Sequence, residues 1–208
     1  VLVDNHFVYI GSHGGGLARL DKRTNRITNY TSKNSTLNSD NVYSLSKDTD
    51  GNIWLGTLNG VMIYNAKDES FRSLSSFLPE SADNKAFLDR IDKHHVYVLY
   101  LDNKKQMWFG TENGIYAYSF QTNRINEYKI EMEDYSSVKR RVYCIFEDGQ
   151  GRIWTGTNAG LSLFDETSRY SKTLTTADGL PNNNVYGILQ DGFQRLWLST
   201  NRGLACYN

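Results

Sequence analysis

Apolar residues in this chain gather in short runs of five to seven residues separated by polar turns. The runs are rich in Val, Ile, Tyr, Trp and Phe, and they are bounded by Gly, Asn and Asp. Such runs are typical of β-strands, because β-branched and aromatic side chains pack well on a pleated, half-buried surface. No segment shows a convincing 3.6-residue period over ten or more residues. The pattern therefore predicts an all-β protein with hardly any helix.

All four tryptophans occupy one repeated motif. It reads NIWLGTLNG, QMWFGTENG, RIWTGTNAG and RLWLSTNRG around Trp54, Trp108, Trp154 and Trp197. A weaker fifth copy, FVYIGSHGG, has Tyr9 at the aromatic position, and the five aromatic residues are spaced by 45, 54, 46 and 43 residues. A repeat of this period is the signature of a solenoid or propeller.

Each repeat holds more than the tryptophan motif. A Val-Tyr run lies upstream, as in NVYSLSKD and RVYCIFED, and two further apolar stretches follow, as in GVMIYN and FRSL. Each unit therefore reads as four short antiparallel strands, which is a β-propeller blade with the Val-Tyr strand innermost. We expect one propeller segment over residues 1–208, with an incomplete last blade and the approximate blade bounds 1–30, 41–77, 95–130, 141–175 and 184–208. We expect it to be part of a larger ring; the alternative is an imperfectly closed ring of five blades.

The aromatic and glycine positions of the motif suggest how the blades pack. Side chains alternate along a strand, so Trp54 and Gly56 share one face. We interpret the indoles as core between blades and the glycines as points where the next sheet approaches closely, at Gly56, Gly110 and Gly156. A row of sugar-stacking tryptophans is the rival interpretation. Cys144 and Cys206 lie in apolar runs and are expected to be buried thiols.

Charge and composition narrow the functional classes. The 208 residues hold 23 Lys and Arg against 23 Asp and Glu, so the formal net charge is zero. That argues against nucleic-acid binding, which needs a basic field, and against binding to a membrane surface. No apolar run reaches the length of a membrane span.

Motifs for catalysis or metal binding are weak. DTDGN at 48–52 resembles a calcium loop but has Asn59 where the bidentate Glu belongs, so it is interpreted as a hairpin turn. His94 and His95 are adjacent and face opposite sides of a strand. GSHGGG lies in a strand-to-strand turn rather than before a helix, so phosphate binding is not expected. We expect no catalytic residues, no metal site and no cofactor in this segment.

The combined pattern V-Y-x-[LI]-x-x-D, I-W-x-G-T-x-x-G and TTADGLPNNNVY at 175–186 resembles the two-component regulator propeller repeat across almost the whole chain. Departures are Tyr9 for Trp, Ser199 for Gly and an insertion in the third unit. The resemblance implies the periplasmic sensor region of a hybrid two-component system of the Bacteroidetes type, which responds to glycan-derived oligosaccharides. The signal would pass to a histidine kinase outside this segment.

That resemblance also implies partners. They would be an oligosaccharide or other small ligand, other blades or domains of the same chain, and a homodimer in the full-length protein. Oligosaccharide binding is expected to be weak, and only in the complete sensor. A streptogramin-lyase-like enzyme, for which His95 is the best-placed histidine, and a structural scaffold are the alternatives.

Binding residues are expected where loops vary on the repetitive frame. The residues that open the innermost strands are predicted at the mouth of the central channel: Asn41, His95, Arg141 and Asn184. The turns between second and third strands add Asn59, Asn113, Asn158 and Arg202, and Tyr135 could stack on a sugar. The alternative is that these groups merely cap strand ends and solvate the rim.

Overall fold

The computed structural model describes residues 1–80, 82–91, 94–130, 140–165 and 170–208, which form five antiparallel sheets. The first sheet contains β1 (Leu2–Val3), β2 (Phe7–Ser12), β3 (Gly16–Asp21) and β4 (Ile27–Tyr30). The second contains β5 (Val42–Lys47), β6 (Ile53–Thr57), β7 (Gly60–Asn65) and β8 (Ser70–Ser73). The third contains β9 (Val96–Leu101), β10 (Gln106–Thr111), β11 (Gly114–Ser119) and β12 (Arg124–Ile130).

The last two sheets continue the series. The fourth contains β13 (Val142–Glu147), β14 (Ile153–Thr157), β15 (Leu161–Asp165) and β16 (Tyr170–Leu174). The fifth has three strands in the structure, β17 (Val185–Gln190), β18 (Leu196–Thr200) and β19 (Gly203–Tyr207), and a short 3-10 helix (Thr176–Asp178) precedes it. A short parallel pairing of β12 with β16 joins the outer strands of the third and fourth sheets.

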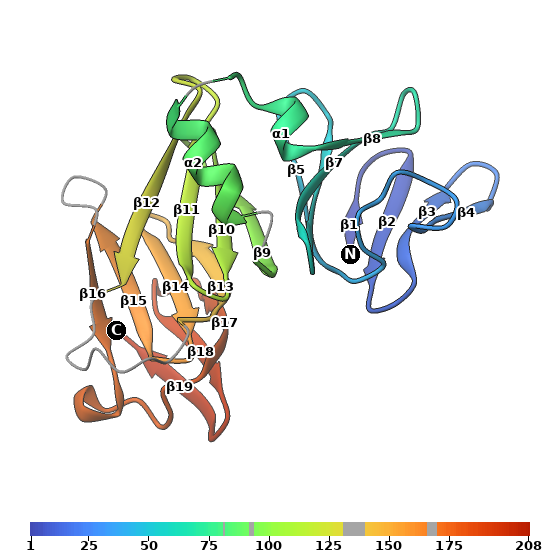
Figure 1. Cartoon of the computed structure of the whole chain (residues 1–208). Helices are drawn as coiled ribbons and strands as arrows, with labels where there is room; N and C mark the ends of the chain where they lie inside the picture. The colour runs from blue at the N-terminus through green and yellow to red at the C-terminus, as the bar shows by residue number, and fades with distance from the viewer. Residues whose placement is uncertain (81, 92–93, 131–139, 166–169) are drawn as a thin grey trace.

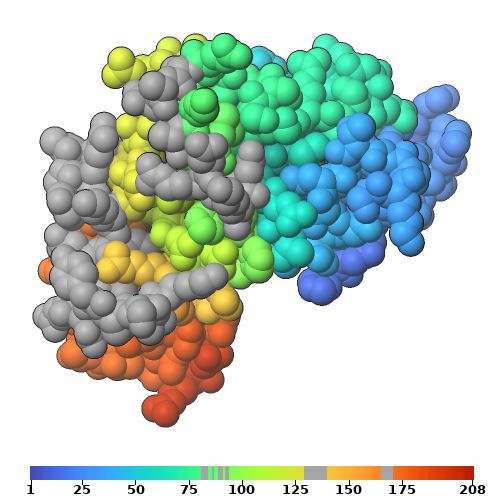
Figure 2. Space-filling model, viewed as in Figure 1, coloured from blue at the N-terminus to red at the C-terminus, as the bar shows by residue number. Residues whose placement is uncertain are grey.

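The five sheets follow one another in an arc, from the first blade in blue to the last in red (Figures 1 and 2). Within each sheet the strands pair in sequence order, so each sheet is a meander. The first strands of successive sheets contact one another: β1 meets β5, β5 meets β9, β9 meets β13 and β13 meets β17. The Val-Tyr strands are therefore innermost, and the predicted β-propeller fold is confirmed.

The motif glycines let neighbouring blades approach closely, as the sequence predicted. A Cβ atom added at Gly56 would lie 2.8 Å from the carbonyl oxygen of Val96, the first residue of the next inner strand. At Gly156 the same atom would lie 2.5 Å from the carbonyl oxygen of Val185. Any side chain at these positions therefore forces the next blade away.

Three of the four indoles form core between blades. Trp54 and Trp108 are fully buried and Trp154 is almost so. Trp54 packs with Val96, Leu99 and Phe109 of the third sheet. The expectation is wrong for Trp197, which is 38% exposed, because no further sheet among the described residues covers that face. Both cysteines were expected to be buried, and this is wrong for Cys206, which is exposed. Burial raises the pKa of Cys144 to about 12.

An aspartate at the end of each of the inner strands β5, β9, β13 and β17 fixes the indole of its own blade. The carboxylate accepts a hydrogen bond from the indole Nε1 at 2.7–2.9 Å in each of the pairs Asp48–Trp54, Asp102–Trp108, Asp148–Trp154 and Asp191–Trp197. The other carboxylate oxygen accepts main-chain N–H groups of the turn, as Asp148 does from Gln150 and Arg152. DTDGN is thus a hairpin turn held by Asp48, as interpreted. The repeated Asp was visible in the sequence, but its bond to the indole was not foreseen.

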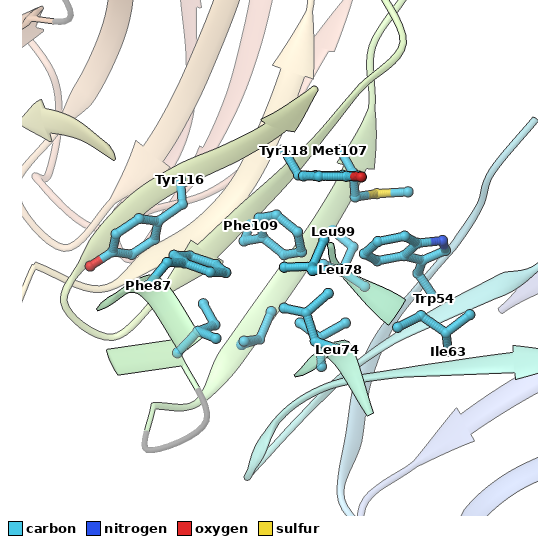
Figure 3. Packing of buried hydrophobic residues seen from close by; sticks show 13 residues of the cluster. Trp54, Ile63, Leu74, Leu78, Phe87, Leu99, Met107, Phe109, Tyr116 and Tyr118 are labelled. Carbon is cyan, nitrogen blue, oxygen red and sulfur yellow. The ribbon is translucent and has the colours of Figure 1, made fainter. Parts of the chain in front are cut away.

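Helices α1 (Leu74–Phe77) and α2 (Ala82–Ile91) correct the expectation of an almost helix-free chain. Helix α1 contacts β7 and β8 of the second sheet, α2 contacts β12 of the third, and the two helices contact each other (Figure 1). Phe87 packs against Phe109 and Tyr116, with ring centroids 5.8 and 5.3 Å apart, and Leu74 and Leu78 join the same cluster (Figure 3). The sequence of α2 shows no clear helical spacing of apolar residues, because the polar Asn84 occupies one of its buried positions. The Asn84 amide donates there to the Pro79 carbonyl.

Gly156→Ala should destabilise the protein by about 1–3 kcal/mol, because its methyl group collides with main chain of the next blade. Thermal and urea unfolding measure the effect. The matched control is Gly192→Ala, where a Cβ meets nothing within 4 Å. Equal stability of the two variants would contradict the proposed close approach.

Asp148→Asn should lower stability at neutral pH by about 1–3 kcal/mol, since it disturbs the bonds from Trp154 and Arg152. Burial pushes the pKa of Asp148 up, but the hydrogen bonds from Trp154 and Arg152 outweigh it and the pKa lies below 3.8. The stabilisation is therefore complete above about pH 4 and is lost as the pH falls through the folded pKa. Unfolding curves from pH 7 to 2 should show the two proteins converging in acid, whereas Asp50→Asn in the exposed turn of the second blade should follow the wild type.

Candidate functional site

The residues that open the inner strands lie beside the turns between second and third strands. The main-chain N–H of Leu58 donates to the Asn41 carbonyl, that of Glu112 to His95, and that of Asn158 to Arg141, at 3.1–3.2 Å. In the fifth blade Val185, which follows Asn184, pairs with Thr200 beside the turn that holds Arg202. We call this side of the molecule the mouth edge: the starts of the inner strands together with the second-to-third turns. The structure thus brings the eight predicted residues of this set to one edge, in four pairs.

A threonine at the end of each of the second strands β6, β10, β14 and β18 shapes this edge. Its hydroxyl donates to the carbonyl of the glycine three residues later, at 2.9–3.0 Å, at Thr57, Thr111, Thr157 and Thr200. The same oxygen accepts the main-chain N–H two residues on, as from Asn113 and Arg202. Each turn is therefore fixed from inside, which explains the Thr of the repeated G-T-x-x-G motif.

Several of the predicted binding amides are engaged in holding the links between blades. Asn59 and Asn38 exchange two side-chain-to-carbonyl hydrogen bonds, at 2.6 and 2.9 Å. The side-chain oxygen of Asn158 accepts the main-chain N–H of Arg141 at 3.0 Å. The amide of Asn184 donates to Asn182. These amides therefore position the mouth edge.

A buried acid lies behind this edge. His94 Nδ1 lies 3.3 Å from the Glu112 carboxylate, and the Asn113 amide lies 3.2 Å from the same ring. Glu112 is buried and His94 is largely so. Together they attach the second-to-third turn of the third blade to the link that follows α2. Within the described ranges no group of three His, Cys, Asp or Glu residues is arranged to hold a metal ion.

The four later inner strands each carry a β-bulge next to the mouth edge. In β5, Val42 lies opposite Thr57 and Ser44 opposite Gly56, so Tyr43 is an extra residue without a partner. The same shift leaves Tyr97, Tyr143 and Tyr186 unpaired in β9, β13 and β17. Bulges redirect side chains and are common beside functional sites.

The bulged tyrosines form contacts from blade to blade. The ring centroids of Tyr43 and Tyr97 are 5.4 Å apart, and those of Tyr143 and Tyr186 are 4.7 Å apart. His13 extends the row at 6.3 Å from Tyr43. We call these five residues the tyrosine row. Sequence reasoning missed it, although the repeated Val-Tyr pair was the available signal.

His95 and Arg141 each contact Tyr97 of the tyrosine row. His95 Nδ1 lies 3.1 Å from the Tyr97 hydroxyl, within hydrogen-bond distance. The Arg141 guanidinium carbon lies 5.4 Å from the centroid of the Tyr97 ring, in cation–π range. Burial raises the pKa of Tyr97 despite nearby Arg141, so its hydroxyl stays protonated at neutral pH. Of the predicted binding residues, these two are therefore brought together on an aromatic surface, while Tyr135 lies outside the described residues.

The model of the two component regulator propeller family matches residues 36–59, 137–159 and 179–202. These segments contain the second-blade, fourth-blade and fifth-blade copies of the tryptophan motif. These three segments of the chain therefore match the two component regulator propeller repeat, as the resemblance indicated. No curated protein matches the chain in sequence.

Solved structures share the fold. The extracellular domain of the hybrid two component system BT4673 from B. thetaiotaomicron is 20% identical to this chain and has a TM-score of 0.78. The match covers 98% of this chain and 26% of that one. The extracellular domain of BT3049 from the same organism has 18% identity and a TM-score of 0.72, covering 97% and 25%. Virginiamycin B lyase from Staphylococcus aureus has 16% identity and a TM-score of 0.67, covering 100% and 68%.

The chain thus spans about a quarter of the length of the two extracellular domains. At these identities the likeness shows the fold alone. In the part of the chain that the structure describes, no helix has the length and apolar character needed to cross a membrane.

Thr111→Val should destabilise the protein by about 1–3 kcal/mol, because it removes the buried hydroxyl that binds both the Gly114 carbonyl and the Asn113 N–H. Chemical denaturation measures the loss. Thr155→Val is the matched control, since the buried Thr155 hydroxyl has no hydrogen-bond partner among the described residues and its replacement should be neutral or stabilising. A control that loses as much stability as Thr111→Val would show that the turn bonds are not the cause.

Proposed function

We propose that this chain is a ligand-binding segment in the periplasmic sensor region of a hybrid two-component regulator. Its ligand is a glycan-derived oligosaccharide, and binding is passed on to a kinase elsewhere in that regulator. The tyrosine row carries the proposal, because four inner strands repeat one bulge that places an aromatic ring beside the mouth edge. The regulator repeat supports the signalling context.

The chemistry of the mouth edge suits a sugar. Aromatic rings offer large, rigid apolar surfaces against which the C–H face of a pyranose packs. His95, Arg141 and the tyrosine hydroxyls supply hydrogen-bonding groups next to those rings. Because the row takes one residue from each of the five blades, it suits an elongated ligand more than a compact one.

Rigidity supports the same proposal. The glycine contacts and the threonine-closed turns hold the blades and the mouth edge in place before any ligand arrives. A preformed surface loses little conformational entropy on binding, which favours recognition of a flexible oligosaccharide.

Tyr97→Ala should weaken oligosaccharide binding by about tenfold, because it removes the ring at the centre of the row. Calorimetry on the intact regulator with short oligosaccharides released from pectin, xylan and chondroitin measures affinity, and a reporter gene measures signalling. Phe193→Ala is the control: Phe193 is exposed in the first-to-second turn of the fifth blade, on the opposite edge.

Circular dichroism of both variants verifies that they remain folded. Affinity and signalling that are unchanged in folded Tyr97→Ala protein would overturn the assignment of the ligand to the tyrosine row.

A further inference from the structure

Arg141 differs from the other well-fixed arginines in what it contacts. Three arginine side chains elsewhere in the described chain lie on carboxylates, at 2.6–2.8 Å: Arg19 on Glu69, Arg152 on Asp148 and Arg195 on Asp191. Arg141 lies instead over the ring of Tyr97. Its guanidinium has neither a carboxylate partner nor a hydrogen bond among the described residues, although its main chain is fixed by Asn158. The five N–H donors of the Arg141 guanidinium thus lie at the tyrosine row and can bind an acceptor from a ligand.

Further cationic groups lie on the same edge. Arg140 precedes Arg141, and Arg202 lies in the second-to-third turn of the fifth blade. His95 lies within hydrogen-bond distance of Tyr97. Among the described residues, the carboxylate of Glu112 acts on Tyr97, and this carboxylate is buried and paired with His94.

At the opposite edge two arginines are already paired. The turn aspartates Asp48, Asp102, Asp148 and Asp191 all lie there, between first and second strands, where indole and main-chain N–H groups hold them. Arg152 and Arg195 of these turns lie on Asp148 and Asp191. The guanidinium of Arg141 has no carboxylate partner among the described residues, so its charge attracts an anion to the mouth edge.

We infer that the ligand of the tyrosine row carries an anionic group, a carboxylate or a sulfate, which Arg141 and His95 bind beside the ring of Tyr97. The inference rests on the proposed function and names the class of oligosaccharide: uronic acid-containing or sulfated rather than neutral. Arg141 accepts the anion in its planar fork of donors, a geometry that fits carboxylates and sulfates. The Tyr97 ring supports the guanidinium from one side, and it supports the sugar ring that bears the anion.

The test compares two trisaccharides that differ only at C6, which is a carboxylate in α-1,4-linked galacturonic acid and a hydroxymethyl group in α-1,4-linked galactose. Each is titrated calorimetrically into the wild-type protein, Arg141→Gln, His95→Gln and the control Arg124→Gln. Arg124 is exposed at the start of β12, away from the mouth edge. A sulfated chondroitin disaccharide serves as a third probe, to distinguish sulfate from carboxylate.

The expected result is that the acidic trisaccharide or the sulfated disaccharide binds at least about tenfold more tightly than the neutral trisaccharide, which is the effect of one charge-assisted bond. Arg141→Gln abolishes this preference, His95→Gln reduces it, and Arg124→Gln retains it. Raising the salt concentration weakens binding of the acidic probe more than that of the neutral one.

Other results overturn the inference in distinguishable ways. Equal binding of acidic and neutral probes, unaffected by Arg141→Gln, contradicts an anionic ligand but leaves the proposed function in place. A preference for the anion that survives Arg141→Gln contradicts the assignment to this residue. Failure of every probe to bind overturns both the inference and the proposed function.

Discussion

The contact between a glycine of one blade and the main chain of the next inner strand sets the spacing of this propeller. At Gly56 and Gly156 a single methyl group would already meet a carbonyl oxygen of the next blade. This close approach buries the neighbouring indoles, whose edge nitrogens are bound by the Asp at the end of their own inner strand. The close packing of the blades and the hydrogen bonds of the indoles therefore favour the same arrangement of neighbouring sheets.

The functional edge depends on that spacing. Because the inner strands lie side by side, a bulge repeated in each of them brings tyrosines of different blades into ring contact. The valine before each tyrosine packs towards the glycine of the preceding blade. In each Val-Tyr pair the valine therefore packs between blades, while the tyrosine lies in the tyrosine row. The same backbone feature holds the blades together and presents the rings. Arg141 and His95 then add polar chemistry to the surface those rings form.

Much of the fold could be predicted from the sequence because the repeat shows one pattern several times. Strand order, the inner position of the Val-Tyr strands and the roles of Trp54 and Gly56 follow from alternation and period. Helix α2 could not be predicted, because it has few turns and Asn84 occupies one of its buried positions. The exposure of Trp197 depends on what covers the fifth blade and not on its own motif.

The candidate site was predictable to a lesser extent. The edge that collects Asn41, His95 and Arg141 follows from the geometry of a meander. The tyrosine row depends on a one-residue bulge. The bulge could not be inferred, because a single sequence does not reveal how the residues of neighbouring strands pair. Likewise, the bonds by which Asn59 and Asn158 hold the links are long-range contacts that only the fold reveals.

The most direct test of the account is a tyrosine-labelled NMR spectrum recorded while an oligosaccharide is titrated into the protein. Ring signals of Tyr43, Tyr97 and Tyr143 should shift together and saturate, while buried Tyr64 and Tyr118, at the ends of β7 and β11 opposite the mouth edge, stay in place. Saturable shifts confined to tyrosines outside the row would contradict the account.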